Sequence, residues 1–336
     1  MRKYILGTED GLRWIHENNG VWEIDSTTAL AGKKVLCGET CDGKIITTAY
    51  RDGVYLSENS GKSWNKVGDS HLAKVRCLRR AKWNGEEVLF TGTEPVGLYV
   101  SYNQGDSWNE LSGVRRLHEI RRWTYPVPGV DPHVRDVTVD GHDTDSLYVS
   151  IQVGGMLVGR QRGQEWEEKR EGLNPDVHRI LMEPYNRSIF YAATGEEGIF
   201  VTEDGGNKWR RCGANFPWTY TIPFEICEPR YLIAGMGRDL PNAWTRRESG
   251  AEAVLAISKD GGENWSASFP GRPLSSMVMA LSFTSPERDS LILGTGVTIG
   301  GATKGNGELY QVDLNSGQWK LLARGLPGIN FIMALQ

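Results

Sequence analysis

Residues 258–265 read Ser-Lys-Asp-Gly-Gly-Glu-Asn-Trp, and this octet decides the fold because it recurs along the chain. Closely similar copies stand at 57–64, 101–108 and 202–209. In such an octet the Asp or Asn side chain bonds nearby backbone amides, the glycine takes a positive φ, and the tryptophan begins the next strand. The octet therefore predicts a tight hairpin turn with one structural Asp or Asn and one structural Trp. These predicted pairs are Asn59 and Trp64, Asn103 and Trp108, Asp204 and Trp209, and Asp260 and Trp265.

Tryptophans continue the repeat beyond the four clear octets. Weaker copies end at Trp22, Trp166 and Trp319, so the tryptophans recur at roughly 40–60 residues, close to the repeat length of propeller blades. A strand, a Gly-rich turn and a second strand precede the octet, and one more strand lies upstream, which makes four strands in each repeat. The sequence therefore predicts an all-β fold, a single seven-bladed β-propeller domain with four-stranded blades over residues 1–336.

The two ends of the chain complement each other. The chain begins with a second-strand pattern, Lys3 to Glu9, and ends with an unpaired first-strand pattern, Ile329 to Leu335. Joining them completes blade one from about 1–25 and 327–336, and removes the open edge between the first and last blades. We therefore expect the C-terminal strand to close the propeller, and a closed propeller without a free sheet edge predicts a monomer.

The composition and charge of the chain exclude some classes of partner and indicate where in the cell the protein is expected. The formal charge of −4 argues against a nucleic-acid partner, which favours a basic protein, and no apolar run reaches the ~18 residues of a membrane span. The N-terminal residues lack the apolar stretch of a signal peptide, and five cysteines without a framework spacing indicate reduced thiols, so we expect a cytoplasmic protein. No zinc spacing, P-loop or nucleophile elbow occurs, so neither a metal nor a cofactor is expected.

The octets resemble the Asp-box (BNR) repeats of the sialidase and VPS10 propellers, over essentially the whole chain. The phrases Gly92-Thr93-Glu94-Pro95 and Gly7-Thr8-Glu9-Asp10 are more similar to the photosystem II assembly-factor type and its bacterial relatives. The resemblance implies the propeller fold, and the assembly-factor type implies a basic patch that binds a partner. It leaves the function open, because this superfamily includes hydrolases, receptors and assembly factors.

Three long insertions fall in the loops opposite the Asp-boxes. They are Gly113 to Pro132 before the first strand of blade four, Gly237 to Ala251 within blade six, and Thr295 to Gly307 within blade seven. Long loops in compact folds tend to carry function, so we expect the working face to be the one opposite the Asp-boxes.

Alignment of the innermost strands places Arg76, Arg135 and His178 at matching positions, with Met279 and Met333 in the same slot of blades seven and one. Arginine binds carboxylate, sulfate or phosphate bidentately, and aromatic rings stack on sugars or other planar groups. The sequence thus predicts a basic, aromatic pocket for an acidic ligand or partner, namely a small molecule, a glycan or a peptide segment. The predicted binding residues are Arg76, Arg135, Trp123, Tyr125, Trp218, Tyr220, Arg238 and Trp244.

An enzyme at the same pocket is the alternative prediction. It would be a hydrolase, lyase or cyclase acting on an acidic small molecule or glycan, with His133 and His178 as acid and base. The carboxylate candidates of that alternative are Asp239, Glu248 and Glu252 in the blade-six loop. A true sialidase is not expected, because the Arg-Ile-Pro tripeptide is absent and no Tyr–Glu pair can be placed beside the arginines.

Structural roles remain open for several of these residues. Arg76 and Arg135 could pair with Glu94 or Asp136 across strands, and His178 could be a hydrogen-bonded structural histidine. The large tryptophans of the loops, Trp123, Trp218 and Trp244, could pack those loops down without touching a ligand. The recurring set of Glu9, Glu94 and Glu196 at strand ends is expected to bond turn backbones.

Overall fold

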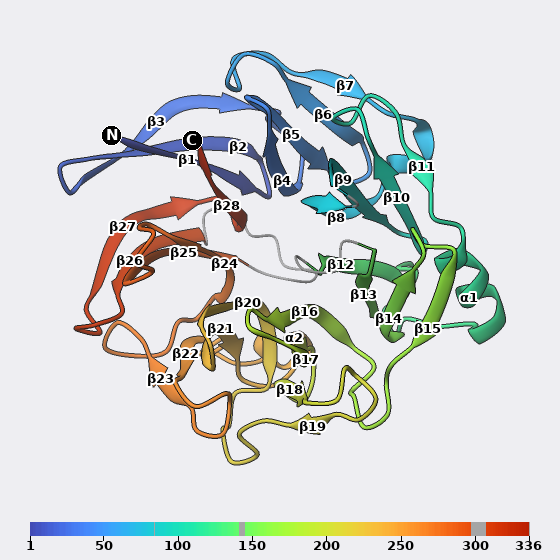
Figure 1. Cartoon of the computed structure of the whole chain (residues 1–336). Coiled ribbons are helices and arrows are strands. Elements are labelled where there is room, and N and C mark those ends of the chain that lie inside the picture. Colours follow the sequence, from blue (N-terminus) through green and yellow to red (C-terminus); the bar gives the residue numbers. More distant parts are fainter. Residues whose placement is uncertain (84, 141–144, 297–306, 336) are drawn as a thin grey trace. The chain divides into compact units, whose positions relative to one another are not determined.

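A computed structural model describes residues 1–83, 85–140, 145–296 and 307–335. Within these ranges the chain forms seven four-stranded antiparallel sheets, the blades of a seven-bladed β-propeller (Figure 1). We number the blades one to seven, beginning with the sheet that holds the N-terminus. The chain divides into two compact units, the first made of 1–35, 195–199 and 211–336 and the second of 36–194 and 200–210. The single-domain organisation over 1–336 stays a prediction.

The first unit holds blades one, six and seven. Blade one has the order β28 (Ile329–Leu335), β1 (Arg2–Thr8), β2 (Gly11–Asn18), β3 (Val21–Ala29). Blade six has the order β20 (Tyr220–Glu228), β21 (Tyr231–Gly237), β22 (Val254–Ser258), β23 (Ser266–Ser268). Blade seven has the order β24 (Met277–Phe283), β25 (Ser290–Gly296), β26 (Gly307–Asp313), β27 (Trp319–Leu326). The short helix α2 (Pro241–Trp244) lies in the blade-six insertion.

Blades two to four lie in the second unit. Blade two runs β4 (Val35–Cys41), β5 (Lys44–Ala49), β6 (Gly53–Ser57), β7 (Asn65–Val67). Blade three runs β8 (Val75–Trp83), β9 (Glu86–Thr93), β10 (Gly97–Ser101), β11 (Asn109–Glu110), after the 3-10 turn Ser70–Leu72. Blade four runs β12 (His133–Val139), β13 (Leu147–Gln152), β14 (Gly155–Arg160), β15 (Glu165–Glu168). The helix α1 (Gly113–Arg121) lies in the insertion before β12.

Blade five completes the set with β16 (Val177–Glu183), β17 (Asn186–Thr194), β18 (Ile199–Thr202) and β19 (Arg210–Arg211).

The split of blade one between the chain ends is confirmed. Strand β28 pairs antiparallel with β1, from Lys3 opposite Leu335 to Thr8 opposite Ile329, and the two ends lie side by side in Figure 1. Ile329 has no solvent exposure, so the last strand contributes to the core as well as to the sheet.

Each Asp-box closes the turn between the third and fourth strands of a blade. In blade six, Ser258 Oγ donates to Asp260 Oδ1 at 2.8 Å and accepts from the Gly262 amide at 2.9 Å, while Asp260 Oδ1 also accepts from the Asn264 amide at 3.0 Å. Trp265 Nε1 donates to the carbonyl of Gly262 at 2.9 Å, and Gly262 has a φ of 91°. The turn is thus held by neighbours in sequence and needs no partner from another blade.

A β-bulge recurs in the first strand of the blades. The register of β8 against β9 shifts at Arg76, that of β12 against β13 shifts at Arg135, and that of β16 against β17 shifts at His178. A bulge leaves one residue unpaired and re-aims its side chain, so these three residues are equivalent in structure as well as in the alignment. The corresponding shift in β24 falls at Met279.

The alignment of Met333 with this set is wrong. In β28 the register shifts between Ile329 and Phe331, so Asn330 is the bulged residue and Met333 pairs in register opposite Ile5. A bulge adds one residue to a strand, and strand alternation alone does not reveal where that residue lies.

A close approach between β9 and β12 brings the bulges of blades three and four together. Gly92 has no side chain, and a Cβ added there would lie 2.5 Å from Val134 Cγ1, closer than atoms can pack. Val134 is fully buried in this contact, immediately before Arg135 in the sequence. The glycine therefore allows the strand that carries Arg135 to pack directly on the blade that carries Arg76.

Candidate functional site

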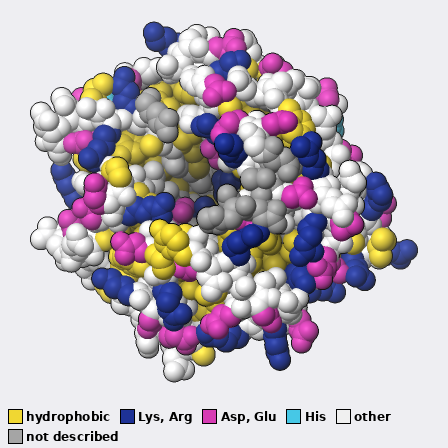
Figure 2. Space-filling model, in the orientation of Figure 1, with side chains coloured by type: hydrophobic (Ala, Val, Ile, Leu, Met, Phe, Trp, Pro, Cys, Tyr) yellow, Lys and Arg dark blue, Asp and Glu magenta, His cyan; other side chains and the backbone are white. Residues whose placement is uncertain are grey.

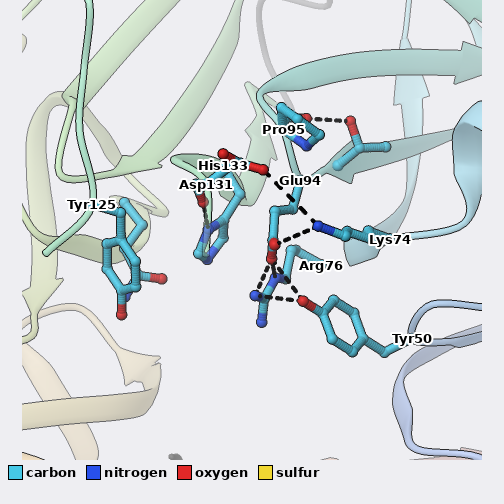
Figure 3. Close-up of polar contacts among 10 residues, drawn as sticks. Tyr50, Lys74, Arg76, Glu94, Pro95, Tyr125, Asp131 and His133 are labelled. Carbon is cyan, nitrogen blue, oxygen red and sulfur yellow. Dashed lines mark hydrogen bonds and ion pairs between the residues drawn. The ribbon is translucent and has the colours of Figure 1, made fainter. Parts of the chain in front are cut away.

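The buried carboxylate of Glu94 accepts hydrogen bonds from several polar side chains of the second unit (Figure 3). Its side chain has no solvent exposure. Lys74 Nζ donates to Oε1 at 3.0 Å, while Tyr50 Oη at 2.8 Å and Arg76 Nε at 2.8 Å donate to Oε2. Arg76 Nη2 also contacts Glu94, and it donates to Tyr50 Oη at 3.0 Å. Glu94 is therefore fully engaged, by donors from the end of β5 and from the start of β8.

These contacts set the protonation state of Glu94. Burial by itself raises the pKa of the carboxyl group, but the charge of Arg76 and the hydrogen bonds outweigh burial and lower the pKa to about 2. The guanidinium of Arg76 also lies over the ring of Tyr50, 4.4 Å from its centroid. Arg76 thus pairs with Glu94, the structural role left open for it. The expectation that Glu94 bonds turn backbones is wrong for its side chain, because the donors nearest to it belong to side chains.

His133 begins β12 beside this cluster and is 2% exposed. Its Nδ1 lies 2.9 Å from the carbonyl oxygen of Asp131, and a carbonyl only accepts, so Nδ1 carries the proton and Nε2 is an acceptor. Burial, followed by the charge of Arg76, lowers the pKa of His133 to about 3, so the ring is neutral near pH 7. Nε2 is buried and has no hydrogen-bond partner among the described residues.

A series of contacts between polar side chains links the insertion before β12 to the inner strands. Gln152 Nε2 donates to Tyr125 Oη at 2.9 Å and lies 3.5 Å from Nε2 of His178. His178 in turn lies 3.4 Å from a carboxylate oxygen of Asp176. The ring of Tyr125 packs edge-on against the ring of His133, with centroids 5.6 Å apart. Figure 3 shows the His133 ring between Tyr125 and the pair of Arg76 and Glu94.

Arg135 and Arg76 both occupy the first-strand bulge of their blades, but among the described residues only Arg76 has a counter-ion. Burial is the main influence on the pKa values of Tyr125, His133 and Asp176, and the charge of Arg135 is a further influence on all three. The half-buried guanidinium therefore lies within electrostatic reach of these side chains. Within the described ranges it forms no ion pair and no hydrogen bond; in particular, Asp136 pairs with Arg79 and Arg179 instead.

The difference between the two arginines follows from the residue at the end of the second strand. In blade three, Val75 pairs with Thr93, and the next residue, Glu94, supplies the carboxylate. In blade four, Val134 pairs with Ile151, and the next residue is the neutral amide Gln152. Blade four thus has the arginine of blade three without its carboxylate.

Comparison with known proteins agrees with this architecture. The family model described as Sortilin, neurotensin receptor 3, matches residues 155–302, which is less than half of the chain. A structure described as YCF48 bound to D1 peptide is 15% identical, with a TM-score of 0.59, and covers 87% of this chain and 86% of that chain. The GH74 xyloglucanase from Xanthomonas campestris is 14% identical, with a TM-score of 0.60, and the match covers 86% of this chain and 45% of that chain. The chain is a seven-bladed β-propeller with Asp-box turns.

One relative with an assigned activity also matches in sequence. The oligoxyloglucan-reducing end-specific xyloglucanase of Emericella nidulans is 22% identical over 171 residues, which cover 44% of this chain and 19% of that enzyme. The chain therefore corresponds to a small part of that enzyme. At these identities the likenesses establish the propeller fold, and they leave the ligand of this chain open.

Six of the predicted binding and acid/base residues of this propeller belong to the second unit. Arg76, Arg135, His133, His178 and Tyr125 gather around Gln152 and Glu94, as described above. Trp123 is 7% exposed, stacks on His118 at 5.6 Å and packs in the blade-three and blade-four core. Trp123 thus has the packing role left open for it.

The remaining predicted residues belong to the first unit, around the blade-six insertion. Trp218 Nε1 donates to the carbonyl of Glu252 at 2.7 Å, and Trp244 Nε1 donates to that of Arg238 at 2.6 Å. Tyr220 is buried and meets Trp244 edge-on at 5.1 Å. The three aromatic side chains hold the insertion against its own sheet.

The charged residues of the insertion pair with one another. Arg247 bonds Asp239 at 2.6 Å and Glu252 at 3.2 Å, and Arg238 lies 3.6 Å from Glu252. Glu248 is exposed. The third predicted insertion, Thr295 to Gly307, lies mostly outside the described residues.

Sequence reasoning missed three residues of the site, namely Tyr50, Lys74 and Gln152. Tyr50 and Glu94 directly follow the second strands of their blades and Gln152 is the last residue of its second strand, so an alignment of second-strand ends groups the three. Glu recurs at strand ends in the sequence, but the same position in blades two and four holds Tyr and Gln.

The surface carries both signs of charge. On the face seen in Figure 2, dark blue Lys and Arg side chains alternate with magenta Asp and Glu side chains. In the part of the chain that the structure describes, no cluster of His, Cys, Asp and Glu could hold a metal ion, and no helix is long and apolar enough to cross a membrane.

Proposed function

We propose that this propeller is a binding module that takes the anionic group of a small molecule, glycan or peptide segment at Arg135. The observation that carries the proposal is the lack of a counter-ion for Arg135 among the described residues, although its equivalent Arg76 has one. A half-buried guanidinium without a partner is costly to keep and gains most from an incoming anion.

Blade three offers an internal example of such a complex. There, an arginine in the bulge and a tyrosine hydroxyl surround a carboxylate. In blade four, Arg135 and Tyr125 would play these two parts. Tyr125 Oη accepts from Gln152, so its own O–H hydrogen remains available for a ligand carboxylate.

The low pKa values of Glu94 and His133 favour binding over catalysis. Tyr50 and Glu94 form a Tyr–Glu pair beside an arginine, the combination that the sequence did not reveal. However, a carboxyl group with a pKa of about 2 and an imidazole with a pKa of about 3 are poor bases near pH 7. Of the two histidines that the enzyme alternative names, His133 would need a large rearrangement to act as a base near pH 7, which leaves His178 as its proton-transfer group.

The relatives support binding of either a peptide or a glycan. YCF48 is described as bound to the D1 peptide, and the GH74 relative is a xyloglucanase. These are properties of those proteins, and the choice among ligands for this chain is a matter for experiment.

The test is a thermal-shift and calorimetric screen with N-acetylglycine, sialyllactose and an acidic peptide as probes. A probe at 100 times its Kd adds about 2.7 kcal/mol of stability, which such a screen detects. We expect Arg135→Ala to weaken a binding probe at least tenfold, and Arg135→Lys to restore only part of the affinity, because lysine cannot form the bidentate contact.

Arg160→Ala is the matched control, since Arg160 pairs with Glu167 on the surface of blade four. A probe whose affinity falls equally with Arg135→Ala and Arg160→Ala, or with neither, would contradict the proposed site.

A further inference from the structure

Nε2 of His133, a hydrogen-bond acceptor, indicates which second chemical group the ligand carries besides its anion. Nε2 is buried and has no hydrogen-bond partner among the described residues, whereas Nδ1 is bonded to the backbone. Leaving a buried acceptor unpaired destabilises the protein, so such a group indicates a site where a hydrogen-bond donor is missing.

His133 and Arg135 lie two residues apart on β12, and residues so spaced project to the same side of a strand. The bulge at Arg135 re-aims its side chain but leaves it within electrostatic reach of the imidazole. Two residues of a strand span about 7 Å, so one small ligand can reach both side chains.

The neighbours of His133 do not satisfy the acceptor. Tyr125 meets the ring edge-on without a hydrogen bond between the two, and the amide of Gln152 donates to Tyr125. The donors of Arg76 are directed to Glu94 and Tyr50. A donor for Nε2 has to come from outside these groups.

We propose that the ligand is a carboxylate with an N–H or O–H donor on the adjacent carbon, the carboxylate binding Arg135 and the donor bonding Nε2 of His133. The chemical class is a 2-acylamino or 2-hydroxy carboxylate. This inference rests on the proposed anion site at Arg135. Nε2 has no solvent contact, so a neighbouring side chain has to move when the donor enters.

The experiment is a double-mutant cycle between ligand and protein. The probes are N-acetylglycine and N-acetylsarcosine, which differ only in methylation of the donor nitrogen, and the proteins are the unmodified chain and its His133→Phe variant. We expect methylation to weaken binding to the unmodified chain about tenfold and to His133→Phe less than twofold. Equal losses in both proteins overturn the inference.

Glycolate and methoxyacetate repeat the cycle for an O–H donor. A methylation effect with the acylamino pair alone assigns the N–H class, and an effect with the hydroxy pair alone assigns the O–H class. In either case the effect has to disappear in His133→Phe for the inference to stand.

A spectroscopic readout covers the case in which His133→Phe does not fold. In the unmodified protein labelled with 15N-histidine, N-acetylglycine should shift the Nε2 signal of His133, and N-acetylsarcosine should shift it much less. Identical shifts with both probes overturn the inference.

Failure of the proposed function is distinguishable from failure of this inference. Absence of saturable binding, or binding that Arg135→Ala does not weaken, overturns both. Binding through Arg135 that is insensitive to methylation of the donor overturns the role of His133 alone.

Discussion

Gln152 lies in blade four at the position that Glu94 holds in blade three, directly after the residue that pairs with the buried valine of the first strand. Glu94 neutralises the bulged arginine of its own blade, and Gln152 cannot do so because an amide carries no charge. One residue type at one position therefore separates a closed ion pair from an arginine that is left for a ligand.

Gln152→Glu should close the candidate site. The new carboxylate would lie beside Arg135 as Glu94 lies beside Arg76, and it would repel an incoming anion. We expect the affinity for an acidic probe to fall at least tenfold, as measured by calorimetry. Gln152→Met is the control, because it removes the hydrogen bond to Tyr125 without adding charge. Equal affinities of the two variants would show that charge at this position does not decide binding.

Glu94→Gln should destabilise the fold. The substitution leaves Arg76 and Lys74 without their shared carboxylate, and breaking a buried pair is costly, although both cations keep some contact with solvent. We expect the free energy of unfolding to fall by about 2–3 kcal/mol, measured by urea denaturation. Glu87→Gln removes an exposed pair with Arg80 and should change stability little. A Glu94→Gln variant as stable as the Glu87→Gln variant would contradict the structural role of the pair.

His133 should make stability depend on pH below neutrality. Burial, with the charge of Arg76 second, lowers its pKa from an ordinary value of 6.5 to about 3. Between these values the unfolded chain binds a proton that the folded chain does not, so the stabilising contribution is present above pH 6.5 and is lost as the pH falls toward 3. The slope is at most about 1.4 kcal/mol per pH unit for one proton.

His133→Gln should flatten this dependence, which urea denaturation at pH 7, 6 and 5 would detect. His71→Gln is the control for loss of an exposed imidazole. A pH dependence that is the same in His133→Gln and in the unmodified protein would assign the dependence to other groups.

Removal of residues 329–336 should abolish cooperative unfolding. Strand β28 pairs with β1 along its length, and Ile329 is fully buried, so the deletion leaves blade one with three strands and an open edge. Circular dichroism during heating would show a broad, non-cooperative change. A synthetic peptide with the sequence of residues 329–336 should restore part of the transition. A soluble truncated chain with a sharp transition would contradict the need for closure by this strand.

Much of the fold was predictable from particular residues. The octet from Ser258 to Trp265 is held by hydrogen bonds between positions two to four apart, so its turn can be recognised from a short stretch. The pairing of the two chain ends followed from counting strands, and the equivalence of Arg76, Arg135 and His178 followed from aligning blades, although the bulge that these residues share is visible only in the structure. Met333 was misplaced, because the bulge in β28 lies three residues earlier than alternation indicated.

The candidate site was predictable only in part. Arg135, His133, His178 and Tyr125 were selected from the sequence, and they do gather in one place. The sequence did not separate Arg76, which is paired, from Arg135, which is not. It also selected Trp123 for a ligand, whereas the core of blades three and four encloses this side chain.

By itself, the sequence determined the number of blades, the turns that join their outer strands and the closure by the last strand, because these depend on local hydrogen bonds and on a repeated pattern. Only the tertiary structure decided which charges neutralise one another. Glu94 meets Arg76 of its own blade from 18 residues away, through strand pairing, and Tyr50 of blade two from 44 residues away, through the packing of one blade on the next. The close approach of Val134 to Gly92 packs the strand that carries Arg135 on blade three, while Glu94 in blade three and Gln152 in blade four decide which arginine is paired, because only a carboxylate neutralises a guanidinium.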